Sequence, residues 1–215
     1  MLTPAAAVPG APWTTAFLDV NTFARRTPGL HHVMTGYAAY GVVLFAGLLV
    51  AGWWIARRQA TTSAMVAALW APLGTLLAVA VNQPIVAGVD EERPYTALHH
   101  ILVLAARSTD PSFPSDHATM AGAVTVGLFL VSRRLGVLSA IAAVLMAFAR
   151  VYIGAHYPQD VIAGLALGAL VTGFGYLLAR HPLTALVRRL EQTRLRPLVT
   201  GGVYGDADGA PATPG

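Results

Sequence analysis

The sequence predicts an all-α integral membrane protein: a bundle of five transmembrane helices plus an N-terminal interfacial or short sixth helix. Of its 215 residues, 55% are hydrophobic and only 11% are charged, and the mean hydropathy is +0.59. Soluble domains carry about 25% charged residues, so the composition excludes an ordinary soluble globule. It also excludes intrinsic disorder, which requires low hydrophobicity and high net charge.

Five apolar runs carry the prediction of the helix bundle. A bilayer core about 30 Å thick takes roughly 20 helical residues to cross, and polar or proline-bearing turns separate these runs. The expected spans are residues 34–55, 64–81, 115–131, 135–154 and 161–179. The second span is expected to stop at Asn82-Gln83-Pro84. Close helix packing is predicted by small residues in the fifth span and its end, namely Gly164, Gly168, Gly173 and Gly175.

The rest of the chain divides around these spans. Residues 1–33 form an N-terminal segment in which apolar and polar residues alternate from Trp13 onward, as in a helix lying along the interface. Residues 34–180 form the membrane-embedded domain. Residues 181–199 form a basic segment, expected in the cytoplasm. Residues 200–215 are rich in Gly, Ala, Pro and Asp, which predicts a disordered tail.

The charged residues indicate the orientation. All 14 basic residues are arginines, and the absence of cysteine excludes disulfides, thiolate metal sites and cysteine catalysis. Basic residues near span ends tend to stay in the cytoplasm. If the spans alternate, nine arginines fall on one side and five on the other, which places the C-terminus in the cytoplasm. The net charge of +4 is then a feature of topology, and no nucleic-acid partner is expected.

Polar groups gather at one set of span ends, away from the arginine-rich loops. Such groups are costly at membrane depth, which makes them functional candidates. In chain order they are Arg93, Ser115-Asp116-His117, Arg150 and His156. The neighbouring acidic residues Asp90, Glu91 and Glu92 are interpreted as a solvated face. A role in bridging a divalent ion to a diphosphate stays open for one of them.

These residue types fit a phosphate. Arginine binds phosphate oxygens with two parallel hydrogen bonds, and a helix that opens at Ser115 presents free N–H groups to an anion. Two histidines can divide nucleophilic and general-acid work. Asp160 lies four residues after His156, where a carboxylate can fix the imidazole tautomer or cap the helix. No cluster has metal-ligand spacing, so no metal or other cofactor is expected.

The motifs that carry these groups are Arg93-Pro94, Pro114-Ser115-Asp116-His117 and Arg150-x5-His156-x3-Asp160. Together, over roughly residues 34–180, they resemble the three signatures of the type-2 phosphatidic acid phosphatase superfamily. The forms Phe-Pro-Ser-Asp-His and His-Tyr-Pro-x-Asp-Val look most like the bacterial undecaprenyl-diphosphate phosphatase branch, whose members confer bacitracin resistance.

The resemblance implies a role for each residue. His156 would attack phosphorus to give a phosphohistidine, Asp160 would orient it, and His117 would protonate the leaving phosphate. Water would then hydrolyse the intermediate. The phosphoryl oxygens would be held by Arg93, Arg150, Ser115 and a backbone N–H near Asp116.

The sequence departs from the family pattern at three positions. Val86 stands where the first motif begins with Lys, so one phosphate contact is missing or comes from elsewhere, with Arg107 as a candidate. Asp116 replaces the commoner Gly, and both proton transfer and helix capping are open roles for it. Ala149 stands where the third motif often has Ser.

The expected function is hydrolysis of undecaprenyl (polyprenyl) diphosphate to the monophosphate at the outer face of a bacterial cytoplasmic membrane, which recycles the lipid carrier of the cell wall. The expected partners are this lipid and the surrounding membrane lipids. Phosphatase action on another lipid phosphate, of the phosphatidylglycerophosphate or phosphatidic acid type or a polyprenyl-phosphoryl sugar phosphate, stays open. A non-hydrolytic lipid transporter and a non-catalytic scaffold are alternatives from other classes. The sequence predicts no oligomeric state.

Overall fold

The computed structural model describes residues 12–201. The described chain is helical and contains no strand. Of the tail expected at residues 200–215, all but the first two residues lie outside the described part. The elements are α1 (Pro12–Arg26), a 3-10 turn (Pro28–Leu30), α2 (His31–Gln59), α3 (Thr62–Val89), α4 (Pro94–Ala97), α5 (Asp116–Val131), α6 (Arg133–Tyr152), α7 (Pro158–Glu191) and α8 (Arg196–Val199).

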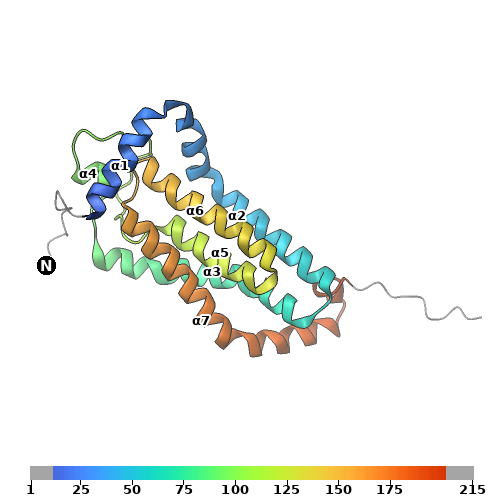
Figure 1. Cartoon of the computed structure of the whole chain (residues 1–215). Coiled ribbons are helices and arrows are strands. Elements are labelled where there is room, and N and C mark those ends of the chain that lie inside the picture. The colour runs from blue at the N-terminus through green and yellow to red at the C-terminus, as the bar shows by residue number, and fades with distance from the viewer. Residues whose placement is uncertain (1–11, 202–215) are drawn as a thin grey trace, which may run out of the picture.

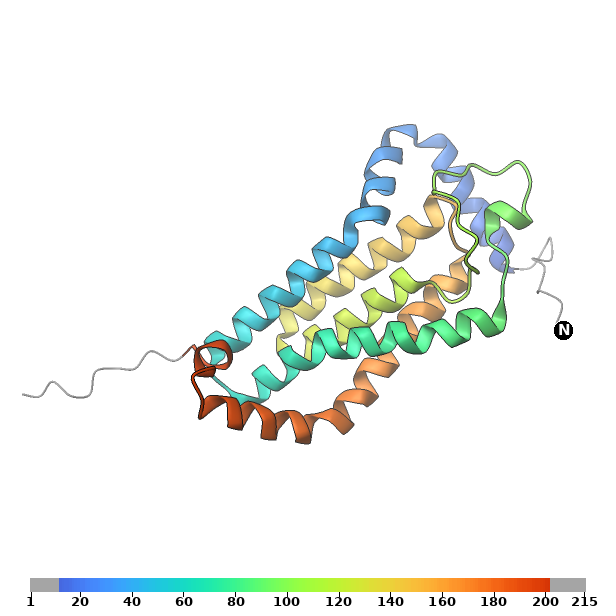
Figure 2. The same ribbon diagram turned by 180° about the vertical axis from the view of Figure 1, so that it is seen from behind.

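Helices α2, α3, α5, α6 and α7 are the long helices of the bundle, and they lie side by side in an elongated arrangement (Figures 1 and 2). By length and hydropathy, α2, α3, α6 and α7 qualify as membrane spans, whereas α5 is a shorter apolar helix of 16 residues. The five correspond one for one to the predicted spans, so the expected fold class is confirmed. Helix α5 contacts α3, α6 and α7 and forms the centre of the bundle.

Helix α3 is longer than predicted. The expected stop at Asn82-Gln83-Pro84 is wrong, because α3 continues to Val89 with Pro72 and Pro84 inside it. A proline removes one backbone hydrogen bond from a helix, but helices in membrane bundles tolerate it because neighbouring helices re-satisfy the freed groups. The extra turns carry Asn82 and Gln83 to one end of the bundle.

Helix α7 also runs beyond its predicted end. It continues as one helix to Glu191, so the basic segment expected to begin at residue 181 is partly its extension. Pro182 lies inside this helix, and the second half of α7 bends toward α8 (Figure 1). Missing N–H groups at proline are a common cause of such bends.

Glycines allow α5 and α7 to approach closely. A methyl group at Gly168 would collide with the Thr119 carbonyl, and one at Gly164 would lie 2.6 Å from the Ser115 carbonyl oxygen. On the other side of the contact, Gly122 faces the backbone of Leu165. Close approach through small residues is how helices associate in membranes. Because Ser115 lies in this contact, the packing also fixes where α5 begins.

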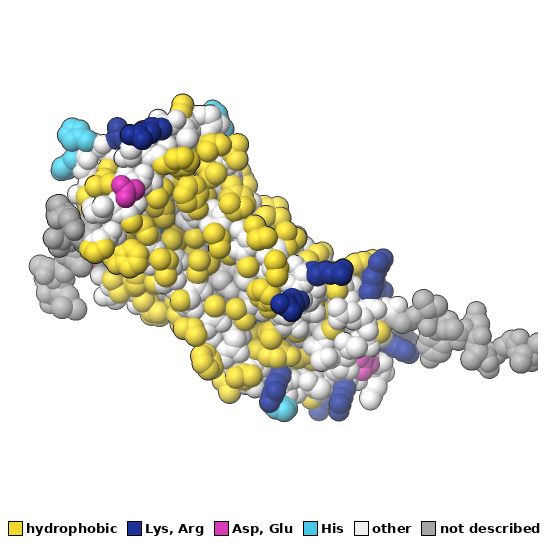
Figure 3. All heavy atoms as spheres, in the orientation of Figure 1, with side chains coloured by type: hydrophobic (Ala, Val, Ile, Leu, Met, Phe, Trp, Pro, Cys, Tyr) yellow, Lys and Arg dark blue, Asp and Glu magenta, His cyan; other side chains and the backbone are white. Residues whose placement is uncertain are grey.

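The outer surface fits a lipid environment. Hydrophobic side chains cover the middle of the molecule, and arginines and histidines lie toward its two ends (Figure 3). Large apolar side chains are exposed along the helices, among them Val43, Leu76, Val144 and Leu178, which is 81% exposed. Soluble monomers do not present such continuous apolar surface. The protein is therefore a multi-pass membrane protein.

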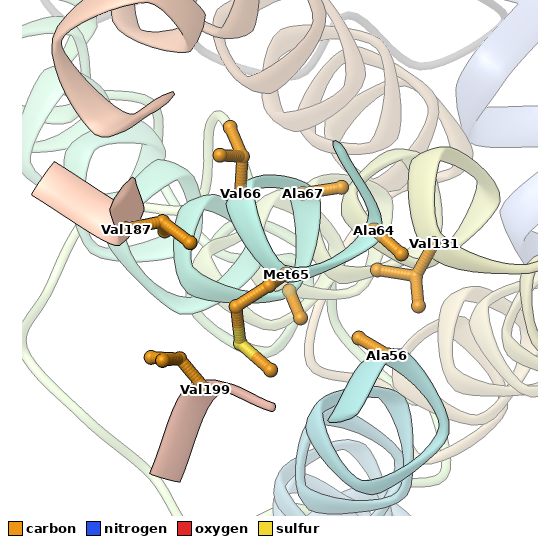
Figure 4. Packing of buried hydrophobic residues seen from close by; sticks show 9 residues of the cluster. Ala56, Ala64, Met65, Val66, Ala67, Val131, Val187 and Val199 are labelled. Carbon is orange, nitrogen blue, oxygen red and sulfur yellow. The ribbon is translucent and has the colours of Figure 1, made fainter. Parts of the chain in front are cut away.

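One end of the bundle is closed by α8, and we call it the α8 end. Val199 packs there in a cluster with Met65 of α3 and Val187 of α7 (Figure 4). The Trp53 indole donates a hydrogen bond to the Leu198 carbonyl oxygen at 3.0 Å. The C-terminal part of the described chain is thus held against the helices.

At the other end, α1 lies across the loops. The Asn21 amide exchanges hydrogen bonds with the backbone of Leu102, at 2.7 and 3.0 Å. Phe17 is fully buried and meets the Tyr157 ring edge-on, with centroids 5.5 Å apart. Helix α1 has 15 residues and is not among the helices of spanning length. It therefore supports the loops between α4 and α5 and between α6 and α7.

Candidate active site

A cavity of about 530 Å³ opens at the end of the bundle covered by α1. Its wall is formed by the last turns of α3, the loop before α5, the first turn of α5 and the loop after α6. The lining includes Gln83, Val86, Arg93, Asp110, Asp116, His117, Arg150 and His156. Residues far apart in the sequence therefore meet at one end of the bundle, as the alternation of spans predicts.

His156 is the most buried titratable group of the lining, with 2% of its surface exposed. Its Nε2 lies 3.2 Å from Nη1 of Arg93 and 3.2 Å from Nη2 of Arg150. Its Nδ1 lies 2.9 Å from the carbonyl oxygen of Ser112. A carbonyl only accepts, so Nδ1 carries the proton and the Nε2 lone pair faces the two guanidinium groups.

The loop backbone holds Arg93 in this position. Its Nε donates to the Asp110 carbonyl at 2.7 Å, and Nη1 is also 3.3 Å from the Ala155 carbonyl. Arg150 comes from the last turn of α6, and its buried Nε has no partner among the described residues. Both arginines keep N–H groups available for an anion placed against Nε2 of His156.

Burial and positive charge act together on the ring of His156. Burial is the main factor that lowers its pKa below the usual value, and the charges of Arg150 and Arg93 lower it further. A lowered pKa keeps the imidazole neutral at neutral pH. The ring is therefore in the form that can act as a nucleophile.

Asp160 lies behind His156 rather than in direct hydrogen bond with it. Its Oδ2 accepts bonds from the Ser112 hydroxyl at 2.5 Å and from the Tyr157 backbone N–H at 2.9 Å, while Nδ1 of His156 is 3.4 Å away. The carboxylate therefore caps the first turn of α7 and fixes Ser112, whose carbonyl in turn orients His156. Both readings of Asp160 made from the sequence, capping and orientation, are compatible with this arrangement.

The start of α5 brings two of its three predicted residues to the cavity. Asp116 and His117 line the wall, and His117 has no hydrogen-bond partner among the described residues. Ser115 is fully buried and is not part of the lining, and its Oγ is likewise unpaired among the described residues. Its backbone N–H donates to the Asp160 carbonyl oxygen at 3.1 Å, which ties α5 to α7.

The structure also locates the departures from the family pattern. Val86 lines the cavity and adds no charge to it. Arg107 does not replace the missing lysine, because its guanidinium lies 5.6 Å from the centroid of the Tyr95 ring and lines a separate cleft. Ala149 is fully buried in the apolar packing of α6.

The acidic run before Arg93 is only partly solvated. Glu92 is exposed, but Glu91 is 9% exposed and accepts a hydrogen bond from the Gln159 amide at 2.6 Å. The interpretation of this run as a solvated face is therefore wrong for Glu91, because its side chain links the loop after α3 to the start of α7. Within residues 12–201, no group of three or more His, Asp or Glu side chains has an arrangement that could hold a metal ion.

Sequence reasoning missed three residues that position the groups of the cavity. Ser112 acts on His156 through its backbone carbonyl, and a backbone atom leaves no mark in the sequence. Asn82 and Gln83 were interpreted as the end of a helix, yet both donate hydrogen bonds to the Asp116 carboxylate. A polar pair in an apolar run was the signal, because polar groups at membrane depth indicate function as readily as a helix end.

Comparison with known proteins identifies the family. Residues 67–181, more than half of the chain, match the PAP2 superfamily. The chain belongs to the PAP2 superfamily. The match covers Arg93, His117, Arg150, His156 and Asp160, so the cavity described above lies within the family domain.

Two curated relatives of this PAP2 protein carry related names. Undecaprenyl-diphosphatase BcrC of Bacillus subtilis is 29% identical over 74% of this chain and 79% of its own length. Bacitracin transport permease protein BcrC of Bacillus licheniformis is 27% identical over 82% of this chain and 88% of its own length. The resemblance stated from the motifs is confirmed, and the protein is a phosphatase.

A solved structure supports the fold independently. The chain resembles a transmembrane PAP2-type phosphatidylglycerolphosphate phosphatase from Bacillus subtilis, with a TM-score of 0.57 and 24% sequence identity. The likeness covers 88% of this chain and 93% of that one. At this identity the comparison shows a shared helix bundle and leaves the substrate to be argued from the site.

Proposed function

We propose that this PAP2 phosphatase hydrolyses undecaprenyl (polyprenyl) diphosphate to the monophosphate at the outer face of the membrane, through a phosphohistidine intermediate. The observation that carries the proposal is the position of His156, whose Nε2 lies between the guanidinium groups of Arg93 and Arg150. A phosphoryl group held by both arginines stands next to the nucleophile.

In the first step, Nε2 of His156 attacks the terminal phosphorus. The bond from this phosphorus to the bridging oxygen breaks, and His117 gives a proton to the leaving lipid phosphate. Burial and the charge of Arg150 lower the pKa of His117 to about 4, so His117 takes up this proton together with the bound anion, whose negative charge opposes that of the arginines. Arg93 and Arg150 stabilise the charge on the equatorial oxygens, and fixed positive groups of this kind supply much of the catalysis of phosphoryl transfer. The Ser112 carbonyl stabilises the imidazolium through Nδ1–H.

In the second step, water attacks the phosphorus of the phosphohistidine. The nitrogen–phosphorus bond breaks, His117 accepts the proton of the water, and inorganic phosphate leaves. Both histidines return to their starting protonation states. No step requires a metal ion or another cofactor, so we expect turnover in the presence of a chelator.

The names of the relatives support the substrate. Two of them are described as an undecaprenyl-diphosphatase and a bacitracin transport protein, and their similarity extends over most of this chain. The apolar surface around the bundle fits a substrate whose tail stays in the lipid. Phosphatidylglycerophosphate and phosphatidic acid are the competing substrates to be tested beside the diphosphate.

The orientation is also part of the proposal. The loops at the α8 end carry the larger share of arginines, and basic loops stay in the cytoplasm, which puts the cavity outside. The chain has no cysteine, so single-cysteine variants report position without background. In intact cells an impermeant maleimide is expected to label His99→Cys and to leave Gln192→Cys unlabelled. The reverse pattern would contradict the proposed orientation.

The catalytic proposal is tested with His156→Ala in detergent-purified protein. With undecaprenyl diphosphate and a chelator present, phosphate release is expected to fall by at least about 10³-fold. His181→Ala, an exposed histidine of α7, is the matched control and is expected to keep the parent rate. Rapid quenching of His117→Ala with labelled substrate is expected to trap acid-labile phosphate on the protein.

Three outcomes would contradict the proposal. If His156→Ala still releases phosphate at the parent rate, His156 is not the nucleophile. A parent protein that acts faster on phosphatidylglycerophosphate or phosphatidic acid than on the diphosphate changes the substrate. Movement of lipid across vesicles without phosphate release makes the protein a transporter.

A further inference from the structure

We propose that the Asp116 carboxylate, held by the side-chain amides of Asn82 and Gln83, selects the protonated form of the bound phosphate by accepting a hydrogen bond from its P–OH group. This inference rests on the proposed function, since it requires that the cavity binds a phosphate. It assigns a specificity-determining role to the Asp116 side chain, for which the sequence left proton transfer and helix capping open.

The first observation is how firmly one oxygen of Asp116 is held. Its Oδ1 accepts a bond from Asn82 Nδ2 at 2.7 Å and one from Gln83 Nε2 at 2.9 Å. Asn82 is fully buried, and the same Nδ2 also donates to the Pro114 carbonyl at 3.2 Å. Both N–H groups of this amide are therefore in use. Helix α3 fixes the carboxylate at the first residue of α5.

The second observation is that the other oxygen is available. Oδ2 of Asp116 has no hydrogen bond among the described residues, and the side chain is exposed in the cavity wall. The same cavity is lined by Arg93, His117, Arg150 and His156. An anion bound by the arginines next to His156 therefore meets Oδ2 as one of its neighbours.

The chemistry of the two partners decides which anion fits. A carboxylate accepts hydrogen bonds and donates none, and a fully ionised phosphate has the same limitation. Two acceptors that face each other repel, whereas a monoanionic phosphate presents a P–OH group that forms a short, strong O–H···O⁻ bond. A site built around one donor or acceptor rejects ligands that lack its complement.

The remaining charges of the cavity favour the same form. Asp110 also lines the wall, with its carboxylate accepting a bond from the Ser108 hydroxyl at 2.6 Å. Two carboxylates thus stand against the two guanidinium groups of the cavity. On the α3 side, Val86 lies one turn from Gln83 and contributes no charge. With two negative and two positive side chains in its wall, the cavity is better matched to a singly charged phosphate group than to a doubly charged one.

Phosphate and sulfate separate these possibilities, because both are tetrahedral but only phosphate keeps a proton near neutral pH. The full chain is purified in detergent, and each anion is measured at pH 6 by competition with the lipid substrate and by protection against thermal unfolding. We expect the parent to bind phosphate at least about ten-fold more tightly than sulfate. The preference is expected to persist at pH 8, because inorganic phosphate then still carries one proton, whereas sulfate carries none.

Asp116→Asn is the decisive variant. Its side-chain oxygen can still accept from Asn82 and Gln83, but its other arm becomes an N–H donor. The preference for phosphate is then expected to fall to within about two-fold or to reverse in favour of sulfate. Glu92→Gln removes a nearby charge outside the cavity and is expected to keep the parent ratio. Gln83→Ala, which removes one of the two donors, is expected to give an intermediate ratio and serves if Asp116→Asn does not fold.

The outcomes distinguish this inference from the proposed function. If the parent binds phosphate and sulfate equally at pH 6, or if Asp116→Asn keeps the full preference, the inference is wrong while phosphate binding stands. If neither anion binds and no lipid phosphate is hydrolysed, the proposed function itself fails.

Discussion

Arginine occurs at both ends of the bundle, but its surroundings differ. At the active-site end, Arg93 and Arg150 converge on Nε2 of His156 at 3.2 Å each. At the α8 end, the guanidinium carbons of Arg57 and Arg58 lie 5.4 and 5.0 Å from the centroid of the Trp54 ring, and Nε of Arg57 donates a hydrogen bond to the Pro197 carbonyl oxygen. The first pair points at a third side chain, and the second pair covers an aromatic surface.

The difference teaches that geometry, and not residue type, separates a binding arginine from an anchoring one. Arginine at a membrane surface commonly spreads its stem over apolar groups and keeps its charge in water. Two like charges that converge on a buried imidazole repel each other, and this arrangement supports the proposed binding of an anion between them. The contrast is open to direct tests.

The largest effect is expected from exchanging one arginine at each end for glutamine. Arg93→Gln removes a donor to the phosphoryl group and is expected to lower kcat/KM by about 10²–10³-fold. Arg57→Gln is expected to change kcat/KM by less than about two-fold, because it leaves the cavity intact. Phosphate release from detergent-purified variants measures both. If the two variants lost kcat/KM equally, the proposed difference between the arginines at the two ends would be wrong.

An intermediate effect concerns the pH profile. The pKa of His156 is lowered by burial and by Arg150 and Arg93, so the ring stays neutral as the pH falls below the usual histidine value. Activity is lost on the acid side only when the pH passes through the lowered pKa. The acid limb of kcat/KM, which reports the free enzyme, is therefore expected at a pH well below the usual pKa of histidine.

Removal of one nearby charge moves this limb in a defined direction. Arg93→Gln is expected to raise the pKa of His156 and to shift the acid limb to higher pH, while Arg107→Gln, outside the cavity, leaves it unchanged. If the acid limb of kcat/KM lies at the same pH in Arg93→Gln as in the parent, the charge of Arg93 does not affect the pKa of His156.

The smallest effect is expected at the α8 end. Trp53→Phe removes the hydrogen bond to the Leu198 carbonyl and is expected to cost about 1 kcal/mol of stability. Thermal unfolding in detergent measures this as a lower Tm, with kcat/KM at the parent value. A loss of activity without a change in Tm would reveal coupling between the two ends.

The sequence was sufficient for the bundle and for the main residues of the cavity. Long apolar runs specify spans, and their alternation alone places Arg93, His117, Arg150 and His156 at one end of the bundle. These side chains act through their own charges and ring nitrogens, so their identity carries their chemistry.

The remaining features depend on contacts that residue types do not specify. The Ser112 carbonyl orients His156 through a backbone atom, and Asp160 acts on the ring through Ser112. The continuation of α3 past Pro84 follows from packing against neighbouring helices, which overrides the local tendency of proline to end a helix. Arg107 shows the opposite error, since its charge suggested the cavity but stacking on Tyr95 holds it elsewhere.

The length of helix α7 indicates how deep in the membrane the active site lies. Its 34 residues extend about 50 Å at 1.5 Å per residue, well beyond a hydrocarbon core about 30 Å thick. Pro182 comes 24 residues after Pro158, about 36 Å along the axis. If the bend marks one membrane surface, the start of α7 and His156 beside it stand at the other. A lipid could then present its headgroup to the nucleophile while its tail never leaves the bilayer.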